Sequence, residues 1–128
     1  FAGETDSAVL LTADAGERVL DQLVTAGLPG EVTLLKLPHH GSRHAAPGKY
    51  LNWLKPPVSF VSAGRNNPFG FPHKETLAAC SKSRSRLYRT DRDGMLQFIG
   101  VDNSWRISSG KGAALQGNPS EENMQKAL

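Results

Sequence analysis

The chain has 128 residues, of which 38% are hydrophobic and 21% charged, with a formal net charge of +3. This composition is ordinary for a globular domain, and the length is sufficient to bury a core. No apolar run approaches the roughly 18–20 residues that span a bilayer, and no signal peptide is visible. One cysteine, Cys80, excludes an internal disulfide and a cysteine-based zinc site. The chain begins with Phe1 rather than Met, as expected of a processed or excised fragment.

Apolar runs and helical spacings alternate along the chain and predict an α/β layered architecture. A turn signal at 91–94 predicts a hairpin between the fourth and fifth strands. From Ser108 the composition changes to Gly, Ser, Asn and Gln, which predicts a domain at 1–107 and a flexible tail at 108–128. The expected strands are 7–12, 32–37, 58–62, 86–89, 95–99 and 105–107, and the expected helices are 17–26, 49–54 and 73–81.

Two adjacent histidines, His39 and His40, follow the second expected strand and precede Gly41. Imidazole is costly to bury without a partner, and it is the commonest protein ligand for transition metals. Asp14 follows the first strand in the same way, and a turn-rich loop at 64–72 follows the third. Ligands gather at the carboxyl ends of strands in such sheets, so we expect one shared site. The alternative is a turn that carries two solvated histidines.

An aspartate and a histidine offer one oxygen and one nitrogen ligand, a set suited to zinc, manganese or iron. A catalytic metal usually needs three or more protein ligands, so this pair is incomplete. His44 and His73 are the remaining histidines. Each of them is either a further candidate ligand or simply a solvated or helix-end residue.

Basic residues concentrate between positions 82 and 92, opposed only by Asp91. Such a stripe can bind phosphates. The alternative is an edge strand whose charges prevent pairing with other chains. The residues are Lys82, Arg84, Arg86, Arg89 and Arg92.

Several motifs, in this order, resemble the C-terminal half of a metallo-β-lactamase-like domain. They are Leu10-Leu11-Thr12-Ala13-Asp14, Leu35-Lys36-Leu37-Pro38-His39-His40-Gly41-Ser42, the segment 62–72, Tyr88-Arg89-Thr90-Asp91 and Gly94. The most similar variety is attached to the bacterial DNA-internalisation competence proteins of the ComEC/Rec2 type. The resemblance covers residues 8–100.

This resemblance implies an αββα sandwich of which the chain is the second half. It implies that Asp14 is the metal-bridging aspartate and His40 the last metal ligand, with His39 lining the site. The cofactor would be a divalent metal, zinc or manganese, with two ions in the complete domain. The implied activity is that of a hydrolase, a nuclease or phosphodiesterase linked to DNA uptake.

The chain departs from the family pattern in two places. The His-x-His-x-Asp-His motif should precede Asp14, yet the sequence holds no histidine before His39. Phe71 stands where the pattern has histidine, and either His73 compensates as a catalytic residue or the loop is purely structural. We therefore expect the isolated chain to be inactive and the parent protein to be the hydrolase.

Two further hypotheses remain open. In the first, the chain is a degenerate, non-catalytic module that binds nucleic acid. In the second, it is a half-sandwich that oligomerises through its uncovered face. The expected partners are nucleic acid (DNA favoured) and either the missing N-terminal half or a second copy of the chain. The chain is expected to be a soluble fragment, with a parent in the bacterial inner membrane. Substrate contacts are expected from polar residues in the matched motifs, namely Ser42, Arg65, Asn67 and Arg89.

Overall fold

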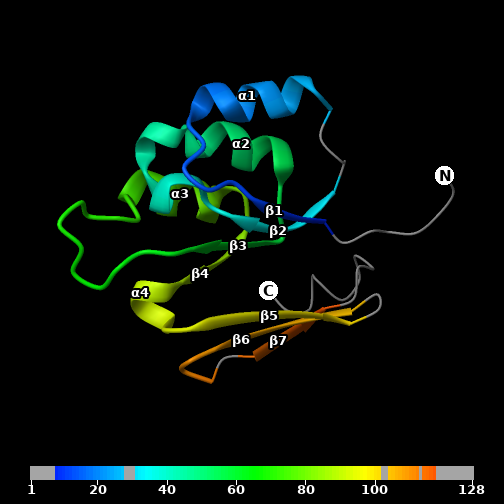
Figure 1. The fold of residues 1–128 in the computed structure, drawn as a ribbon, viewed down its shortest axis with the longest axis vertical. Coiled ribbons are helices and arrows are strands. Elements are labelled where there is room, and N and C mark those ends of the chain that lie inside the picture. Colours follow the sequence, from blue (N-terminus) through cyan, green and yellow to red (C-terminus); the bar gives the residue numbers. More distant parts are fainter. Residues whose placement is uncertain (1–7, 28–30, 102–103, 113, 118–128) are drawn as a thin grey trace, which may run out of the picture.

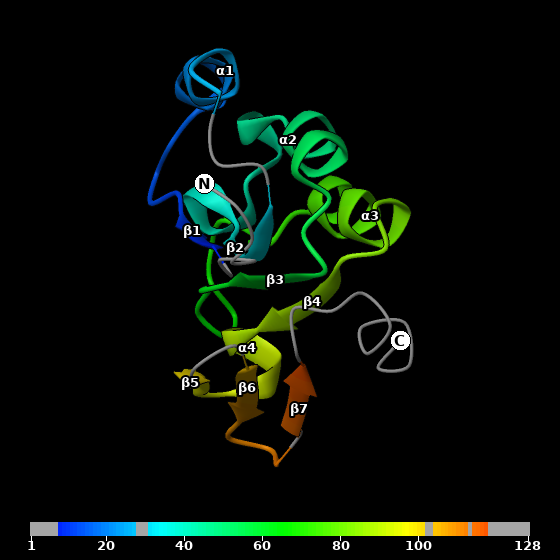
Figure 2. The same cartoon turned by 90° about the vertical axis from the view of Figure 1, so that its right-hand side faces the viewer.

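The structure is a computed structural model that describes residues 8–27, 31–101, 104–112 and 114–117. Within these residues a helical layer, a parallel sheet and an antiparallel sheet are stacked in that order (Figures 1 and 2). The parallel sheet contains β1 (Ala8–Leu11), β2 (Val32–Lys36), β3 (Val58–Val61) and β4 (Arg86–Arg89). The antiparallel sheet contains β5 (Leu96–Val101), β6 (Ser104–Ser109) and β7 (Ala114–Gly117).

Three helices connect the parallel strands and lie together on one face of their sheet (Figure 2). They are α1 (Glu17–Thr25), α2 (Pro47–Leu54) and α3 (Lys74–Lys82). A short helix, α4 (Thr90–Asp93), follows β4, and two 3-10 turns lie at Pro38–Gly41 and Arg43–Ala45. The mixed α/β architecture expected from the sequence is confirmed. Each of the nine expected strands and helices that the structure describes lies within two residues of its predicted bounds.

The predicted hairpin between the fourth and fifth strands is wrong. β4 pairs in parallel with β3, whereas β5 pairs with β6 in the other sheet. The Thr90 hydroxyl accepts a hydrogen bond from the Ala63 N–H and donates one to the Ala63 carbonyl, both 2.9 Å long. These bonds hold the start of α4 against the end of β3. The chain therefore leaves the first sheet at this point instead of folding back on β4.

The flexible tail at 108–128 stays a prediction, but paired strands extend into its first ten residues. β6 continues to Ser109, and β7 pairs with it in an antiparallel register. Gly110 also donates a main-chain hydrogen bond of 2.8 Å to Met95. Pairing with neighbouring strands outweighs the weak strand preference of Gly, Ser and Asn in this stretch. Residues 118–128 lie outside the described part of the chain.

One hydrophobic core lies between the three helices and the parallel sheet. Its buried members come from the three helices, from β2 and β3 and from the turns after β2: Leu20, Val32, Leu35, Leu37, Ala45, Tyr50, Leu51, Val61 and Cys80. A parallel sheet needs such cover because its strands are apolar on both faces.

The second core lies between the two sheets. Leu34, Val58, Tyr88 and Ile107 are buried there, and the Phe60 and Phe98 rings pack 4.8 Å apart. The antiparallel sheet thus covers the face that the half-sandwich hypothesis left open, except at β1. There Val9 and Leu11 remain 57% and 65% exposed. No helix within the described residues is long and apolar enough to cross a membrane.

Candidate metal-binding site

The carboxyl ends of β1, β2 and β3 meet at one edge of the parallel sheet, as the sequence predicted. Register pairs Leu11 with Lys36 and Lys36 with Phe60, so the three strands end side by side. The Thr12 hydroxyl donates to the Lys36 carbonyl at 2.6 Å. The His39 N–H donates to the Ala13 carbonyl at 2.9 Å. These bonds connect the segment after β1 directly to the histidine pair after β2.

Both histidines adopt the left-handed backbone region, with φ of 49° at His39 and 54° at His40. This conformation costs an L-residue roughly 1–2 kcal/mol. Gly41 follows with φ 78°, and a Cβ there would lie 2.6 Å from the Cβ of Pro72. Strained non-glycine residues cluster at functional sites, where the surrounding fold holds them in place. The close approach of Pro72 therefore leaves no room for a side chain at Gly41.

His40 and Asp14 face each other at this edge. The His40 Nε2 lies 3.9 Å from the Asp14 Oδ1, and both side chains are exposed. The His40 Nδ1 lies 2.8 Å from the Ser62 carbonyl oxygen, which can only accept a hydrogen bond. Nδ1 therefore carries a proton, and in the neutral ring Nε2 faces the carboxylate with its lone pair. Metal-ligating histidines are commonly oriented by a hydrogen bond of this kind.

His39 lies beside this pair and is also exposed. Its ring centroid lies 6.1 Å from that of Phe71. Within the described residues, neither ring nitrogen of His39 has a hydrogen-bond partner. The side chain is thus available for proton exchange, and its catalytic role stays a prediction.

His73 is held by the main chain at both ring nitrogens. Nδ1 accepts a hydrogen bond of 3.0 Å from the Arg43 N–H, so Nε2 carries the proton and donates to the Phe69 carbonyl at 3.1 Å. The ring is therefore occupied in holding two loops together. Its expected catalytic role is untested, and a different role is argued below. His44 is exposed and lies 6.4 Å, ring to ring, from His73.

Two of the expected substrate contacts are used inside the fold. Ser42 is 2% exposed, and its hydroxyl accepts the His44 N–H at 3.2 Å. The Asn67 side chain donates to the Gly64 and Phe71 carbonyls and accepts the Phe71 N–H, at 2.8–2.9 Å. Both side chains therefore shape the loops around the site, and a contact with substrate stays a prediction for each.

The two expected arginine contacts differ from one another. Arg89 forms a bidentate pair with Asp91, with distances of 3.1 and 2.7 Å, and is 22% exposed. This pair raises the pKa of Arg89 and lowers that of Asp91, chiefly through the side-chain hydrogen bonds. Arg65 is exposed and donates from Nε to the Asp91 carbonyl at 3.4 Å. Arg65 therefore keeps the more accessible positive charge.

The basic stripe at 82–92 follows the edge of the parallel sheet, because β4 is its last strand. Acidic neighbours bind two of its members, Arg89 through Asp91 and Arg92 through Asp93. These observations favour the charged edge strand over a phosphate-binding surface, although phosphate binding itself stays a prediction.

Aromatic rings next to the histidines form a feature that the sequence reasoning missed. Phe71 packs between Phe69 and His40, with ring centroids 5.5 and 6.0 Å away and interplanar angles of 22° and 24°. The Phe-Gly-Phe spacing in the loop was the available signal. Sequence reasoning treated Phe71 only as a lost histidine.

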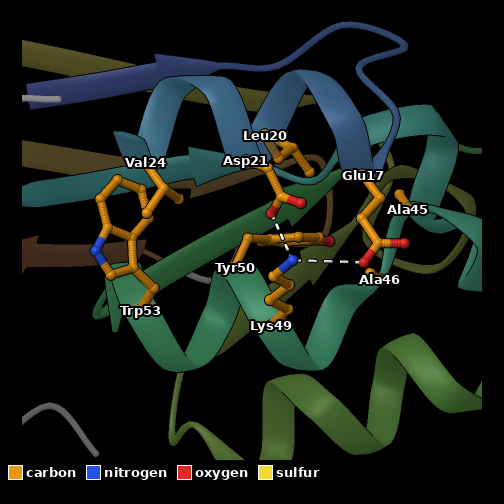
Figure 3. A pocket seen from close by; sticks show the side chains of 9 residues that line it. All are labelled: Glu17, Leu20, Asp21, Val24, Ala45, Ala46, Lys49, Tyr50 and Trp53. Carbon is orange, nitrogen blue, oxygen red and sulfur yellow. Dashed lines mark ion pairs between the residues drawn. The ribbon is translucent and has the colours of Figure 1, made fainter. Parts of the chain in front are cut away.

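A cavity of about 210 Å³ lies elsewhere, between α1 and α2 (Figure 3). Lys49 bridges Asp21 at 2.6 Å and Glu17 at 3.5 Å beside it, and Tyr50 and Trp53 line it. It contains none of the predicted site residues. The Lys49 bridge fastens α1 to α2, and we assign the cavity to helix packing.

No group of three His, Cys, Asp or Glu side chains that could hold a metal occurs among residues 8–27, 31–101, 104–112 and 114–117. Asp14 and His40 form a pair of potential ligands, and metal binding by them stays a prediction. Two tetrahedral ligand atoms about 2.0–2.2 Å from one ion lie roughly 3.3–3.6 Å apart, so the 3.9 Å separation would shorten by a few tenths of an ångström on binding. The donor chemistry and the fixed imidazole both fit a divalent cation.

The fold and this edge define a mixed α/β domain whose candidate site lies where its parallel strands end. Three bacterial proteins are homologous to the chain over about 70% of its length. ComE operon protein 3 of Bacillus subtilis is 32% identical over 90 residues, which are 70% of this chain and 12% of that protein. Recombination protein 2 of Haemophilus influenzae is 30% identical over 91 residues, 71% of the chain and 11% of that protein.

Competence protein ComA of Neisseria gonorrhoeae is 33% identical over 95 residues, 72% of this chain and 14% of that protein. The homologues are therefore competence proteins of the type that the motifs indicated. The chain spans about one eighth of the length of these relatives. No protein-family profile matches the chain. No solved structure matches it either.

Proposed function

We propose that this chain supplies part of a divalent-metal-dependent site that hydrolyses nucleic-acid phosphodiesters in a DNA-uptake protein. The observation that carries this proposal is the relation of Asp14 to His40. Their ligand atoms lie 3.9 Å apart, and the Ser62 carbonyl orients the imidazole so that Nε2, and not Nδ1, faces Asp14. An isolated surface histidine has no need of such an anchor.

Asp14 and His40 would hold the cation, with zinc or manganese as the favoured ions. When bound, a divalent cation supplies Lewis acidity to a phosphoryl oxygen. Further ligands must come from outside the described residues. Because the chain spans about one eighth of its relatives, we propose that another segment of the longer protein provides them. A second copy of the chain is the alternative source.

The chain's other residues have separate roles in this proposal. His39 is exposed beside the metal pair and can accept or donate a proton at either ring nitrogen. Arg65 offers a positive charge to the phosphate backbone at the same edge. The site is open to solvent, as a polymeric substrate requires.

The proposal is tested by adding Mn²⁺ to the isotopically labelled chain and recording amide line broadening by NMR. Paramagnetic broadening detects even the weak binding that two ligands give. We expect broadening centred on Asp14 and His40, lost in both the Asp14→Ala and His40→Ala variants. His44→Ala is the matched control because it removes an exposed histidine outside the pair. Broadening that survives both substitutions contradicts the proposal.

The hydrolytic step requires the parent protein. There we expect His40→Ala to abolish metal-dependent cleavage of DNA while His44→Ala retains it. Equal activity in the two variants would count against His40 as a ligand.

A second candidate function is a non-catalytic module that binds nucleic acid. It is favoured by the lack of a three-ligand group within the described residues and by Phe71 at the position of the family histidine. DNA binding without any metal binding at Asp14 and His40 would select this alternative. A parent in the inner membrane and a homo-oligomeric assembly stay expectations.

A further inference from the structure

Phe69 presents an aromatic ring to solvent beside the candidate metal site. Its side chain is 69% exposed, and its ring stacks on Phe71 at 5.5 Å. A single exposed apolar side chain is ordinary on a protein surface. The position of this one therefore has to be explained by what surrounds it.

The loop that carries Phe69 is held rigidly at several points. The three side-chain hydrogen bonds of Asn67 close the loop around Phe69 and Gly70. The His73 Nε2–H donates to the carbonyl of Phe69 itself, 3.1 Å away. Two polar side chains thus fix the main chain of a residue whose own side chain contacts mostly water. Such preorganisation lowers the entropy lost when a ligand binds.

The exposed ring is the outer end of a stack that leads to the metal pair. From Phe69 the stack passes to Phe71 and then to His40, in steps of 5.5 and 6.0 Å with interplanar angles of 22° and 24°. His40 faces Asp14 at the other end. A flat ring added to Phe69 would extend this stack at its outer end, with two phenylalanine rings between it and His40.

We propose that Phe69 is a stacking platform for one nucleobase of a single-stranded nucleic acid, while another phosphodiester further along the same strand lies at Asp14 and His40. This inference rests on the proposed function and names its substrate class. Bases stack on aromatic side chains irrespective of sequence, and a base pair in a duplex hides these faces. Arg65, in the same loop, is exposed and has no carboxylate partner within the described residues. Its charge complements the phosphates of such a strand.

Asn67 and His73 are then positioning residues. Each fixes the loop that presents Phe69, and neither needs to touch the nucleic acid. This role accounts for the complete use of the Asn67 amide and of both His73 ring nitrogens in main-chain contacts.

The test uses the full chain in EDTA and measures anisotropy with three labelled oligonucleotides of equal length. They are oligo(dT), an abasic strand with the same phosphates, and a duplex. We expect Phe69→Ala to weaken oligo(dT) binding about tenfold. Binding of the abasic strand and the duplex should be unchanged. Phe69→Trp should restore the affinity for oligo(dT), and oligo(U) should behave like oligo(dT) because stacking does not require DNA.

Met95→Ala is the matched control, since Met95 is 74% exposed and directly precedes β5, outside the loop that carries Phe69. It should leave all affinities unchanged, and neither substitution should alter the melting temperature. Equal weakening of the oligo(dT) and abasic complexes, an unaffected oligo(dT) complex, or no measurable binding of oligo(dT) would each overturn the inference.

The two proposals fail in distinguishable ways because these measurements contain no metal. A base-dependent effect of Phe69→Ala without Mn²⁺ binding at Asp14 would retain the platform and remove the hydrolase. Mn²⁺ binding without a base-dependent effect would do the reverse.

Discussion

The Nε2 of His40 lies 3.9 Å from the Oδ1 of Asp14, although the two residues follow different strands. This separation is too long for a direct hydrogen bond. It is set by the fold, since Ser62 anchors the imidazole and parallel register brings the ends of β1 and β2 together. The fold, and not a direct hydrogen bond between the two side chains, therefore sets their separation.

The first prediction concerns the tautomers of the two anchored histidines. His40 should be protonated at Nδ1 and His73 at Nε2, because each of these nitrogens faces a carbonyl oxygen. Two-bond ¹H–¹⁵N NMR spectra of the imidazole rings at pH 9 distinguish the two forms. The same tautomer at both residues would show that one of the two anchors is absent in solution.

The second prediction concerns Gly41. An alanine there would meet Pro72 at 2.6 Å and Val61 at 3.2 Å in a left-handed backbone, so Gly41→Ala should destabilise the fold. We expect a loss of about 2–5 kcal/mol in the free energy of unfolding by urea. It should also displace His40 and weaken Mn²⁺ binding.

Gly48→Ala is its control. Gly48 lies in α2 with no heavy atom within 4 Å of an added Cβ. That substitution should be neutral or stabilising by up to about 1 kcal/mol. Similar effects of the two substitutions would mean that the packing of Gly41 on Pro72 does not constrain the turn.

The third prediction is a loss of stability in acid through the Arg89–Asp91 pair. The hydrogen bonds from Arg89 hold the pKa of Asp91 below its usual value. As the pH falls below about 4, the unfolded chain takes up this proton before the folded chain does, so the stabilisation is lost. It is fully present at pH 7.

Asp91→Asn should therefore cost about 1 kcal/mol at pH 7 and less at pH 3, as measured by urea unfolding at each pH. Asp91→Asn in an Arg89→Gln background should cost less at pH 7 than in the wild type. An undiminished cost in that background would place the effect outside the pair.

The fourth prediction concerns Cys80. It is 2% exposed, and burial raises the pKa of its thiol to about 11. The two units above its ordinary value correspond to about a hundredfold less thiolate, which is the reactive form. At pH 8 the folded chain should react with a thiol reagent at least about a hundredfold more slowly than the chain unfolded in guanidinium. Comparable rates would mean that α3 opens readily from the sheet.

The sequence by itself determined the order and approximate bounds of the elements that it predicted, because hydrophobic periodicity is a local property. It missed α4 and β7. It also placed Asp14, His39 and His40 at strand ends, since their positions in the chain follow from those bounds. The switch to a second sheet at Thr90 was not predictable in this way. It depends on a hydrogen bond between Thr90 and Ala63, which are distant in sequence.

Only the tertiary structure decided what the polar side chains at the site do. Ser42, Asn67 and His73 carry residue types that suit binding or catalysis, yet contacts from neighbouring loops engage them. The stack of Phe69, Phe71 and His40 likewise joins two separate segments. Residue type limits the chemistry that a side chain can perform. The hydrogen-bond partners that the fold brings to a side chain then decide how much of that chemistry is still available.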